Sequence, residues 1–259
     1  MNNSSLRTAL TIAGSDPTGG AGLQADLRAF KALGVYGLSV PSVLTAQNTE
    51  GVYGIQEIPS GFFSEQLDRL LKDIRPDALK TGMLYTSDIV KIISEKIEAY
   101  SLHNLVIDPV TVSSTGVLLV EESALDAVKN ILFPLARVIT PNIYEASVLT
   151  GSDIRNDEDI KDAMLKLKRF GPETVIVTGG HMEEKAVDML FDGEEFLSVE
   201  NDKLPDEFHG TGCVFSSVIT ACLALGYDVK EAFVKAKEFV WNAMSSAVSP
   251  GKGMKILNF

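Results

Sequence analysis

Apolar runs of strand type alternate with segments of helical period along the chain. Strands are predicted by short runs rich in β-branched and aliphatic residues at 8–13, 38–44, 78–82, 105–108, 138–140 and 175–178. Helices are predicted where apolar residues recur at helical spacing, at 23–33, 62–74, 87–100, 123–132, 157–170, 214–225 and 229–248. The pattern is clearest in residues 157–170, where Ile160, Met164 and Leu167 fall on one face.

This alternation predicts an α/β fold, a three-layer α/β/α sandwich in which helices cover both faces of a mostly parallel central sheet. Residues 185–191 and 194–199 flank Asp192-Gly193, a pair typical of tight hairpin turns, so we expect the sheet to end in antiparallel strands. The 259 residues contain no repeat, linker or low-complexity stretch. We therefore expect a single domain over residues 1–259.

Composition excludes several classes of function. The formal net charge is −12 and no cluster of Lys or Arg offers a basic face, so we expect no nucleic-acid partner. Residues 1–7 lack the apolar stretch of a signal peptide, and polar groups interrupt every long apolar run, so we expect a cytoplasmic protein without a membrane partner. Cys213 and Cys222 lie nine residues apart on one predicted helix and cannot form a disulfide with each other.

The segment Gly210-Thr-Gly-Cys213 precedes the predicted helix at 214–225 and favours anion binding. Glycine lets a ligand approach the backbone, and the first N–H groups of a helix have no internal partner and carry the positive end of its dipole. The same field favours a thiolate at Cys213. The structural alternative is a helix capped by Thr211, with Cys213 as a small core residue.

Polar and glycine residues also follow the other predicted strands, where ligands bind in an open parallel sheet. The segments are 14–22, 45–49, 80–83, 108–110, 140–145 and 178–181. The glycine-rich segment 14–22 lacks the spacing and the lysine of a Walker phosphate loop. Asn142 and Glu145 are three residues apart, a spacing that fits either a helix-capping arrangement or a magnesium–water site.

Taken in order, these motifs resemble the hydroxymethylpyrimidine and phosphomethylpyrimidine kinases of thiamine synthesis, in the ribokinase-like superfamily. The resemblance runs from about residue 8 to the final helix and rests on LTIAGSDPTGGAGLQAD (10–26), TAQNT (45–49), KTGM (80–83), DPV (108–110), TPN (140–142) with Glu145, GGH (179–181) and HGTGC (209–213). Sugar kinases of the superfamily usually carry aspartate where this chain has Cys213. The resemblance implies two successive transfers of the ATP γ-phosphoryl group, to the hydroxymethylpyrimidine and then to its monophosphate, with ATP and Mg²⁺ as cofactors.

The resemblance also implies roles for individual residues. Gly210, Gly212 and Cys213 would form the catalytic anion hole, with Cys213 as the base that accepts the substrate hydroxyl proton after the helix N-terminus lowers its pKa. Residues implied to bind the substrate, with Gln47 on the aminopyrimidine edge, are Gln47, Gly14, Ala21, Met83 and Val110. On composition alone, Met83 and Val110 fit a core position equally well. Residues implied to bind nucleotide and magnesium, the latter through water, are Asp108, Asn142, Glu145, Thr178, Gly179, Gly180 and Thr211. His181 and His209 are interpreted as structural or as supporting a neighbouring site residue. Asp16 could cap the first helix or contact a phosphate, and it receives no assigned role.

One departure from the family pattern concerns residues 113–116, Ser-Ser-Thr-Gly, where many relatives carry a lysine. The second phosphorylation is therefore less secure than the first, unless Lys80 or Lys252 supplies the charge. Two alternatives stay open: a pyridoxal kinase of the cysteine-bearing type, and a non-catalytic sensor of the small molecule. Relatives often dimerise, so we expect a homodimer.

Overall fold

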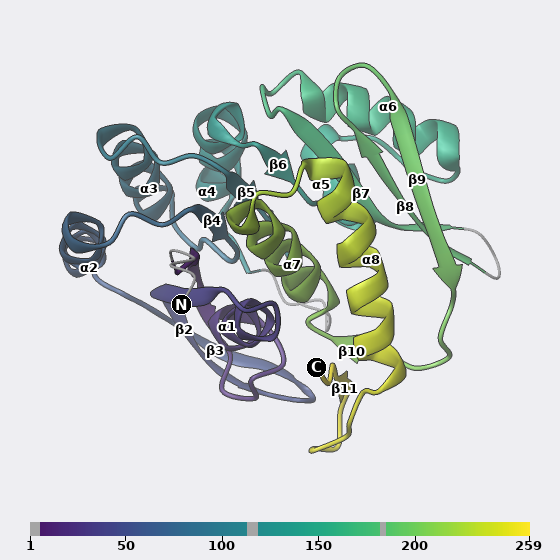
Figure 1. Cartoon of the computed structure of the whole chain (residues 1–259), viewed down its shortest axis with the longest axis horizontal. Helices are drawn as coiled ribbons and strands as arrows, with labels where there is room; N and C mark the ends of the chain where they lie inside the picture. Colours follow the sequence, from purple (N-terminus) through teal and green to yellow (C-terminus); the bar gives the residue numbers. More distant parts are fainter. Residues whose placement is uncertain (1–5, 113–118, 182–184) are drawn as a thin grey trace, which may run out of the picture.

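A nine-stranded sheet forms the centre of the protein, described here by a computed structural model over residues 6–112, 119–181 and 185–259 (Figure 1). Its strand order is β3-β2-β1-β4-β5-β6-β7-β8-β9. The strands are β1 (Thr8–Ser15), β2 (Tyr36–Asn48), β3 (Gly51–Glu57), β4 (Ala78–Thr81), β5 (Leu105–Ile107), β6 (Val138–Ile139), β7 (Thr174–His181), β8 (Lys185–Phe191) and β9 (Phe196–Asp202). The pairs from β2 through β7 are parallel, while β3, β8 and β9 are antiparallel to their neighbours.

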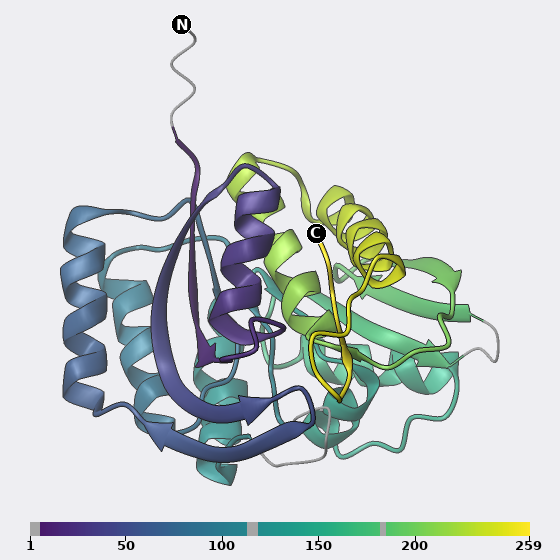
Figure 2. The same ribbon diagram turned by 90° about the horizontal axis from the view of Figure 1, so that it is seen from below.

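Helices cover both faces of this sheet, as the sequence predicts. One face packs against α1 (Gly22–Ala32), α7 (Thr211–Leu225) and α8 (Val229–Ser245), which lie together in Figures 1 and 2. The other face packs against α2 (Ser60–Asp73), α3 (Ser87–Ala99), α4 (Glu122–Ala127), α5 (Ile143–Thr150) and α6 (Asp157–Lys168). Neighbouring residues of the parallel strands therefore face opposite layers: Val106 packs with the first group and Ile107 with the second. The three-layer α/β/α architecture is confirmed.

The main departure from the predicted elements is the antiparallel edge formed by β2 and β3. Residues 45–48 do not form a loop after a strand; they continue β2 and pair with β3, an element that the sequence analysis missed. The turn between the two strands is set by Asn48, whose side-chain oxygen accepts hydrogen bonds from the N–H groups of Glu50 and Gly51. Gln47 consequently lies on a paired strand, where the pairing with β3 and the turn hold its backbone.

Smaller differences occur at element ends. The helix predicted at 123–132 is α4 followed by a π-helical turn (Val128–Leu132) and a 3-10 turn (Phe133–Leu135). The 3-10 turn contains Pro134 in its first turn, where the missing N–H is tolerated, and the helical segment ends there. No sequence pattern indicates β10 (Phe208–His209) and β11 (Lys255–Ile256), a short parallel pair that ties the C-terminal segment to the start of α7. Among the described residues, no helix is both long and apolar enough to cross a membrane.

Candidate active site

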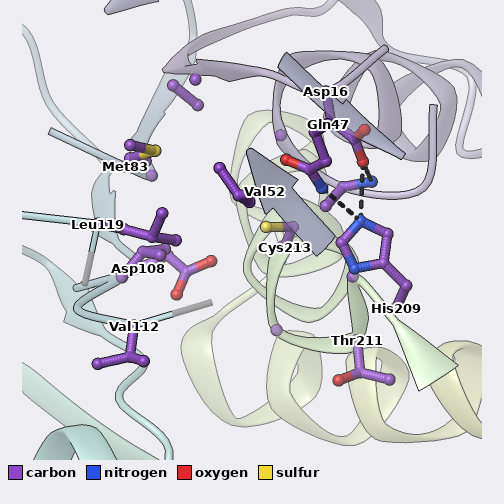
Figure 3. Close-up of a pocket in the computed structure, with 18 of the residues that line it drawn as sticks. Asp16, Gln47, Val52, Met83, Asp108, Val112, Leu119, His209, Thr211 and Cys213 are labelled. Carbon is purple, nitrogen blue, oxygen red and sulfur yellow. Dashed lines mark hydrogen bonds and ion pairs between the residues drawn. The ribbon is translucent and has the colours of Figure 1, made fainter. Parts of the chain in front are cut away.

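A pocket of about 500 Å³ lies beyond the carboxyl ends of the parallel strands (Figure 3). It collects residues from every strand end singled out by the sequence. The sequence-predicted residues that line it are Gly14, Ala21, Gln47, Met83, Asp108, Val110, Asn142, Glu145, Thr178, Gly210, Thr211, Gly212 and Cys213. Gly179 and Gly180 follow Thr178 on β7, where the pairing with β8 is irregular. Met83 and Val110 also pack in a small apolar cluster with Val43 and Leu119, so these two residues combine a pocket-lining position with apolar packing, and their contact with substrate stays a prediction.

The start of α7 has the geometry of an anion hole. Gly210 adopts a left-handed conformation (φ 83°), and a Cβ atom there would lie 1.9 Å from the carbonyl oxygen of Gly20, so only glycine fits. Gly210, not Thr211, is the N-cap, and no side chain caps this helix. The capping role considered for Thr211 is therefore wrong. The N–H groups of the first turn stay available to a ligand at the pocket wall.

The fold around Cys213 favours the protonated thiol. Cys213 is only partly exposed to the pocket, and burial, with the nearby carboxylate of Asp108, raises the pKa of the thiol to about 12. The lowered pKa expected from the helix N-terminus is wrong, because the loss of solvent around the sulfur outweighs the field of the helix. Burial raises the pKa of Asp108 more than the neighbouring charge of Lys80 lowers it.

A buried lysine lies beneath the anion hole. Lys80 Nζ is 2.8 Å from Asp26 Oδ1 and 4.0 Å from Asp108 Oδ2, and it donates to the carbonyl oxygen of Cys213 at 3.4 Å. The Lys80 side chain has no exposed surface. It therefore cannot replace the phosphate-binding lysine of the relatives. Lys252 is exposed near the C-terminus, and residues 113–116 lie outside the described part of the chain.

Asn142 and Glu145 form a complete capping box at the start of α5. Asn142 Oδ1 accepts from the Glu145 N–H at 2.8 Å, and Glu145 Oε2 accepts from the Asn142 N–H at 2.9 Å. Burial and the charge of Asp108 raise the pKa of Glu145 to about 8. The capping interpretation is thus confirmed, and it leaves Glu145 as a pocket-lining carboxyl close enough to Asp108 to be repelled by it.

The carboxyl groups of Asp108 and Glu145 fit a Mg²⁺ ion that takes its remaining ligands from water and from substrate phosphates. In the described ranges no group of three or more His, Cys, Asp or Glu side chains is arranged to hold a metal ion. Burial raises the pKa of both Asp108 and Glu145, and the charge of Asp108 raises that of Glu145 further, a repulsion that a dication between them would relieve. Since Mg²⁺ keeps several waters and takes its other ligands from substrate phosphates, two carboxylates are sufficient.

The pocket also contains Asp16, to which the sequence assigned no role, and His209, which the sequence favoured as a structural or supporting residue. His209 Nε2 lies 2.8 Å from Asp16 Oδ2 and 3.0 Å from the amide nitrogen of Gln47, as the dashed lines in Figure 3 show. Asp16 does not cap α1, whose N-cap is Ala21 without a side-chain hydrogen bond. The one sequence signal for a role of His209 in the site is its position directly before Gly210. The sequence does not show that the glycine-rich segment 14–22 folds against His209.

The sequence is similar to characterised kinases over nearly its whole length. A family model described as phosphomethylpyrimidine kinase matches residues 16–258. The chain is 39% identical over 252 residues to the hydroxymethylpyrimidine/phosphomethylpyrimidine kinase of Bacillus subtilis (strain 168), covering 96% of this chain and 93% of that protein. It is 43% identical over 246 residues to the thiamine biosynthesis bifunctional protein ThiED of Geobacter sulfurreducens. That match covers 94% of this chain and 50% of the relative, so the chain spans about half of that longer protein.

Solved structures with two different printed activities share the fold. The phosphomethylpyrimidine kinase of Clostridium difficile 630 superposes with a TM-score of 0.81 at 39% identity, covering 92% of this chain and 99% of that one. The pyridoxal kinase of Staphylococcus aureus in complex with pyridoxal superposes with a TM-score of 0.91 at 35% identity, covering 98% and 94%. These neighbours confirm the ribokinase-like architecture, and they show that the fold alone does not separate the two substrates.

Proposed function

Because the chain belongs to the phosphomethylpyrimidine kinase family, we propose that it phosphorylates 4-amino-5-hydroxymethyl-2-methylpyrimidine. In the first reaction it transfers the γ-phosphoryl group of ATP to the hydroxymethyl group of this pyrimidine. In the second reaction it transfers another phosphoryl group to the monophosphate. The observation that carries this proposal is the start of α7. There, the left-handed Gly210 precedes the first turn of α7, whose residues 211–213 line the same pocket as Asp108. The N–H groups of this turn have no partner within the helix. We further propose that residues 1–259 act as one ribokinase-like domain, and the expected homodimer remains a prediction.

The first requirement of the reaction is placement of charge. Phosphoryl transfer needs little covalent help from the protein, so rate comes from positioning and from stabilising charge on the transferred group. The N–H groups at the start of α7 would hold the oxygens of the transferring phosphoryl group. Thr178, with Gly179 and Gly180 beyond it on β7, would take the nucleotide side of the pocket. A bound Mg²⁺, held by Asp108 and Glu145 through water, would neutralise the phosphate oxygens.

The second requirement is a path for the hydroxyl proton. The substrate oxygen forms a bond to the γ-phosphorus while the bond from phosphorus to the bridging oxygen of ADP breaks, and that oxygen keeps the electron pair. Since the pKa of the Cys213 thiol is raised to about 12, Cys213 does not start as a thiolate. Its sulfur instead takes the hydroxyl proton as its own proton passes to the carboxylate of Asp108, which lines the same pocket and whose charge acts on the thiol. Cys213 thus relays the proton, and Asp108 receives it.

The experiment is ADP release by the purified protein with ATP, Mg²⁺ and one of three acceptors: the hydroxymethylpyrimidine, its monophosphate or pyridoxal. We expect turnover with both pyrimidines, and a loss of roughly 100-fold or more in Cys213→Ala. Cys222→Ala is the matched control, because Cys222 is a core residue of the same helix and should leave turnover intact. Turnover with pyridoxal alone would reassign the substrate, and turnover with none of the three would favour a sensor.

A further inference from the structure

We propose that Asp16 and His209 fix the orientation of the Gln47 side-chain amide. In this orientation the carbonyl oxygen of the amide faces His209 and its NH₂ group faces Thr45. The amide then selects rings that carry a hydrogen-bond donor next to the hydroxymethyl arm. The inference rests on the proposed function, since it assumes that the pocket binds a hydroxymethyl-bearing ring. It assigns Asp16 and His209 as positioning residues that determine specificity through Gln47.

The carboxylate of Asp16 acts purely as a hydrogen-bond acceptor. Its Oδ1 accepts from the Thr18 N–H at 2.8 Å, and its Oδ2 accepts from the Thr18 hydroxyl at 2.9 Å and from the Ala21 N–H at 2.8 Å. Burial opposes ionisation of Asp16, but the hydrogen bonds from His209 and from Thr18 lower its pKa below the ordinary value. A carboxylate in this state needs a donor at its remaining contact, so Nε2 of His209 must carry a proton.

The proton on Nε2 of His209 decides which end of the Gln47 amide faces the imidazole. The amide nitrogen of Gln47 lies 3.0 Å from Nε2 of His209, which would place two donors face to face (Figure 3). A half-turn of the amide exchanges its nitrogen and oxygen within the same space. With the oxygen toward His209, Nε2–H donates to both the carboxylate of Asp16 and the carbonyl of Gln47. This holds whether the imidazole ring is neutral or charged, because Nε2 carries a proton in both cases.

A separate contact requires the same orientation. The hydroxyl of Thr45 has a single proton, and it donates that proton to the carbonyl oxygen of Ser15 at 2.7 Å. Thr45 Oγ1 is 3.2 Å from the other end of the Gln47 amide and has only an acceptor left to offer. That end must therefore be the NH₂ group. Two independent contacts, one on each side of the amide, thus agree on one orientation.

The surrounding backbone is shaped to hold His209 in place. A Cβ atom on Gly20 would lie 2.7 Å from Cδ2 of the His209 ring, so glycine at this position makes room for the imidazole. His209 is 8% exposed and Asp16 is 3% exposed, which keeps competing water from their contact. His209 also directly precedes Gly210 on the chain. The residue that orients Gln47 is therefore joined directly to the start of the anion hole, which fixes the distance between ligand-ring recognition and phosphoryl binding.

This orientation has a consequence for the ligand. In the proposed binding mode, the hydroxymethyl arm points to Cys213 and the neighbouring ring substituent faces the carbonyl oxygen of Gln47; Gln47, His209 and Cys213 line the same pocket. In the aminopyrimidine, that substituent is the amino group, a donor, and the next ring nitrogen accepts from the free N–H of the Gln47 NH₂ group. Pyridoxal carries a formyl group at the corresponding place, which is an acceptor. The amide therefore favours the aminopyrimidine over pyridoxal.

The test compares two ligands with opposite patterns. The 4-oxo analogue of the hydroxymethylpyrimidine has a carbonyl in place of the amino group and a proton on the neighbouring ring nitrogen. We expect the wild-type protein, titrated calorimetrically with Mg²⁺ and a non-hydrolysable ATP analogue, to bind the amino compound roughly 100-fold more tightly than the oxo compound. His209→Asn removes the donor at the Nε2 position and should reduce this preference below about tenfold. His209→Gln restores a donor at that reach and should retain most of the preference.

A purely structural role for His209 predicts a different result, because both variants would then weaken binding of both ligands alike. That outcome, or a wild-type protein without a preference, would overturn the proposal. The protonation of Nε2 is measured separately by ¹⁵N NMR of the imidazole, with the His209→Asn spectrum identifying the signal among three histidines. An unprotonated Nε2 would also overturn it. Because binding and NMR do not require turnover, these results are distinct from a failure of the proposed kinase activity.

Discussion

Lys80 and Asp26 form an ion pair in the interior: Lys80 Nζ lies 2.8 Å from Asp26 Oδ1, and neither side chain has any exposed surface. Asp26 also accepts hydrogen bonds from the hydroxyls of Thr11 and Ser217, at 2.5 Å and 2.6 Å. Since the same ammonium group contacts the carbonyl of Cys213 and approaches Asp108, the pair supports the floor of the active site. It connects β1, β4 and the two central helices α1 and α7.

Removing one partner of this pair should strongly destabilise the protein. We expect Lys80→Met to lower the free energy of unfolding by about 3 to 5 kcal/mol, because it leaves the carboxylate of Asp26 buried without a cation. Urea denaturation measures this loss. The double variant with Asp26→Asn should recover part of it, while Lys91→Met, which breaks an exposed pair with Asp88, should cost less than about 1 kcal/mol. A double variant no more stable than Lys80→Met would contradict this account.

Gly210→Ala should be far more damaging than an alanine at another left-handed glycine. The Cβ atom would meet the carbonyl oxygen of Gly20 at 1.9 Å, so the start of α7 must shift, and we expect a loss above about 3 kcal/mol together with the loss of turnover. Gly34 is the control, because it has φ 75° but no neighbouring atom within 4 Å of the position that a Cβ would occupy. Gly34→Ala should cost only about 1 to 2 kcal/mol of conformational strain. Thermal melts followed by circular dichroism would compare the two; equal losses would refute the steric argument.

The contribution of Glu145 to the stability of the metal-free protein should fall as pH rises from about 4.5 to about 8, because Glu145 has an ordinary pKa of 4.5 and a folded-state pKa of about 8. Over this window the folded state holds a proton that the unfolded state has released, so each step up in pH favours unfolding. Glu145→Gln removes this titration while its carbonyl still accepts from Asn142 N–H. At the upper end of the window it should be more stable than the wild type by on the order of 2 kcal/mol. Unfolding free energies of both proteins across the window, without Mg²⁺, decide the matter; parallel curves would exclude Glu145 as the source.

Lys237 should affect the nucleotide side of the pocket from a distance. Its Nζ lies 2.9 Å from Asp188 Oδ2, and Asp188 Oδ1 accepts from the N–H of Gly179 at 2.9 Å. Without Lys237, the buried carboxyl of Asp188 tends to take up a proton, since burial already raises its pKa, and its hold on Gly179 weakens. We expect Lys237→Met to raise the KM for ATP roughly fivefold with a smaller change in kcat.

The matched control for this variant is Lys235→Met, on the same helix but at an exposed position. Lys235 contacts the ring of Tyr227 and lies away from Asp188, so the KM for ATP should not change. Steady-state kinetics at saturating pyrimidine measure both variants. An equal rise in KM for the two, or a rise in neither, would remove Lys237 from the nucleotide side.

Most of the fold was predictable because its signals are local. The stripe of residues 160, 164 and 167 follows from helical period, and the hairpin at Asp192-Gly193 follows from turn chemistry. The strand β3 was not predictable in the same way. Its partly exposed residues show no strong apolar alternation, and it exists because β2 offers an unpaired edge.

The sequence by itself determined the alternation of the central strands and helices, the glycines at the start of α7 and the set of residues that meets at the strand ends. Each depends on short-range pattern and on the rule that parallel strands end at one edge. Only the tertiary structure decided the chemistry of these groups. Whether Cys213 is a thiol or a thiolate depends on how much solvent the fold removes from it, and the role of His209 depends on a contact with Asp16 across 193 positions of the chain. Hydrogen-bond partners and solvent exposure are properties of packing, which no local pattern records.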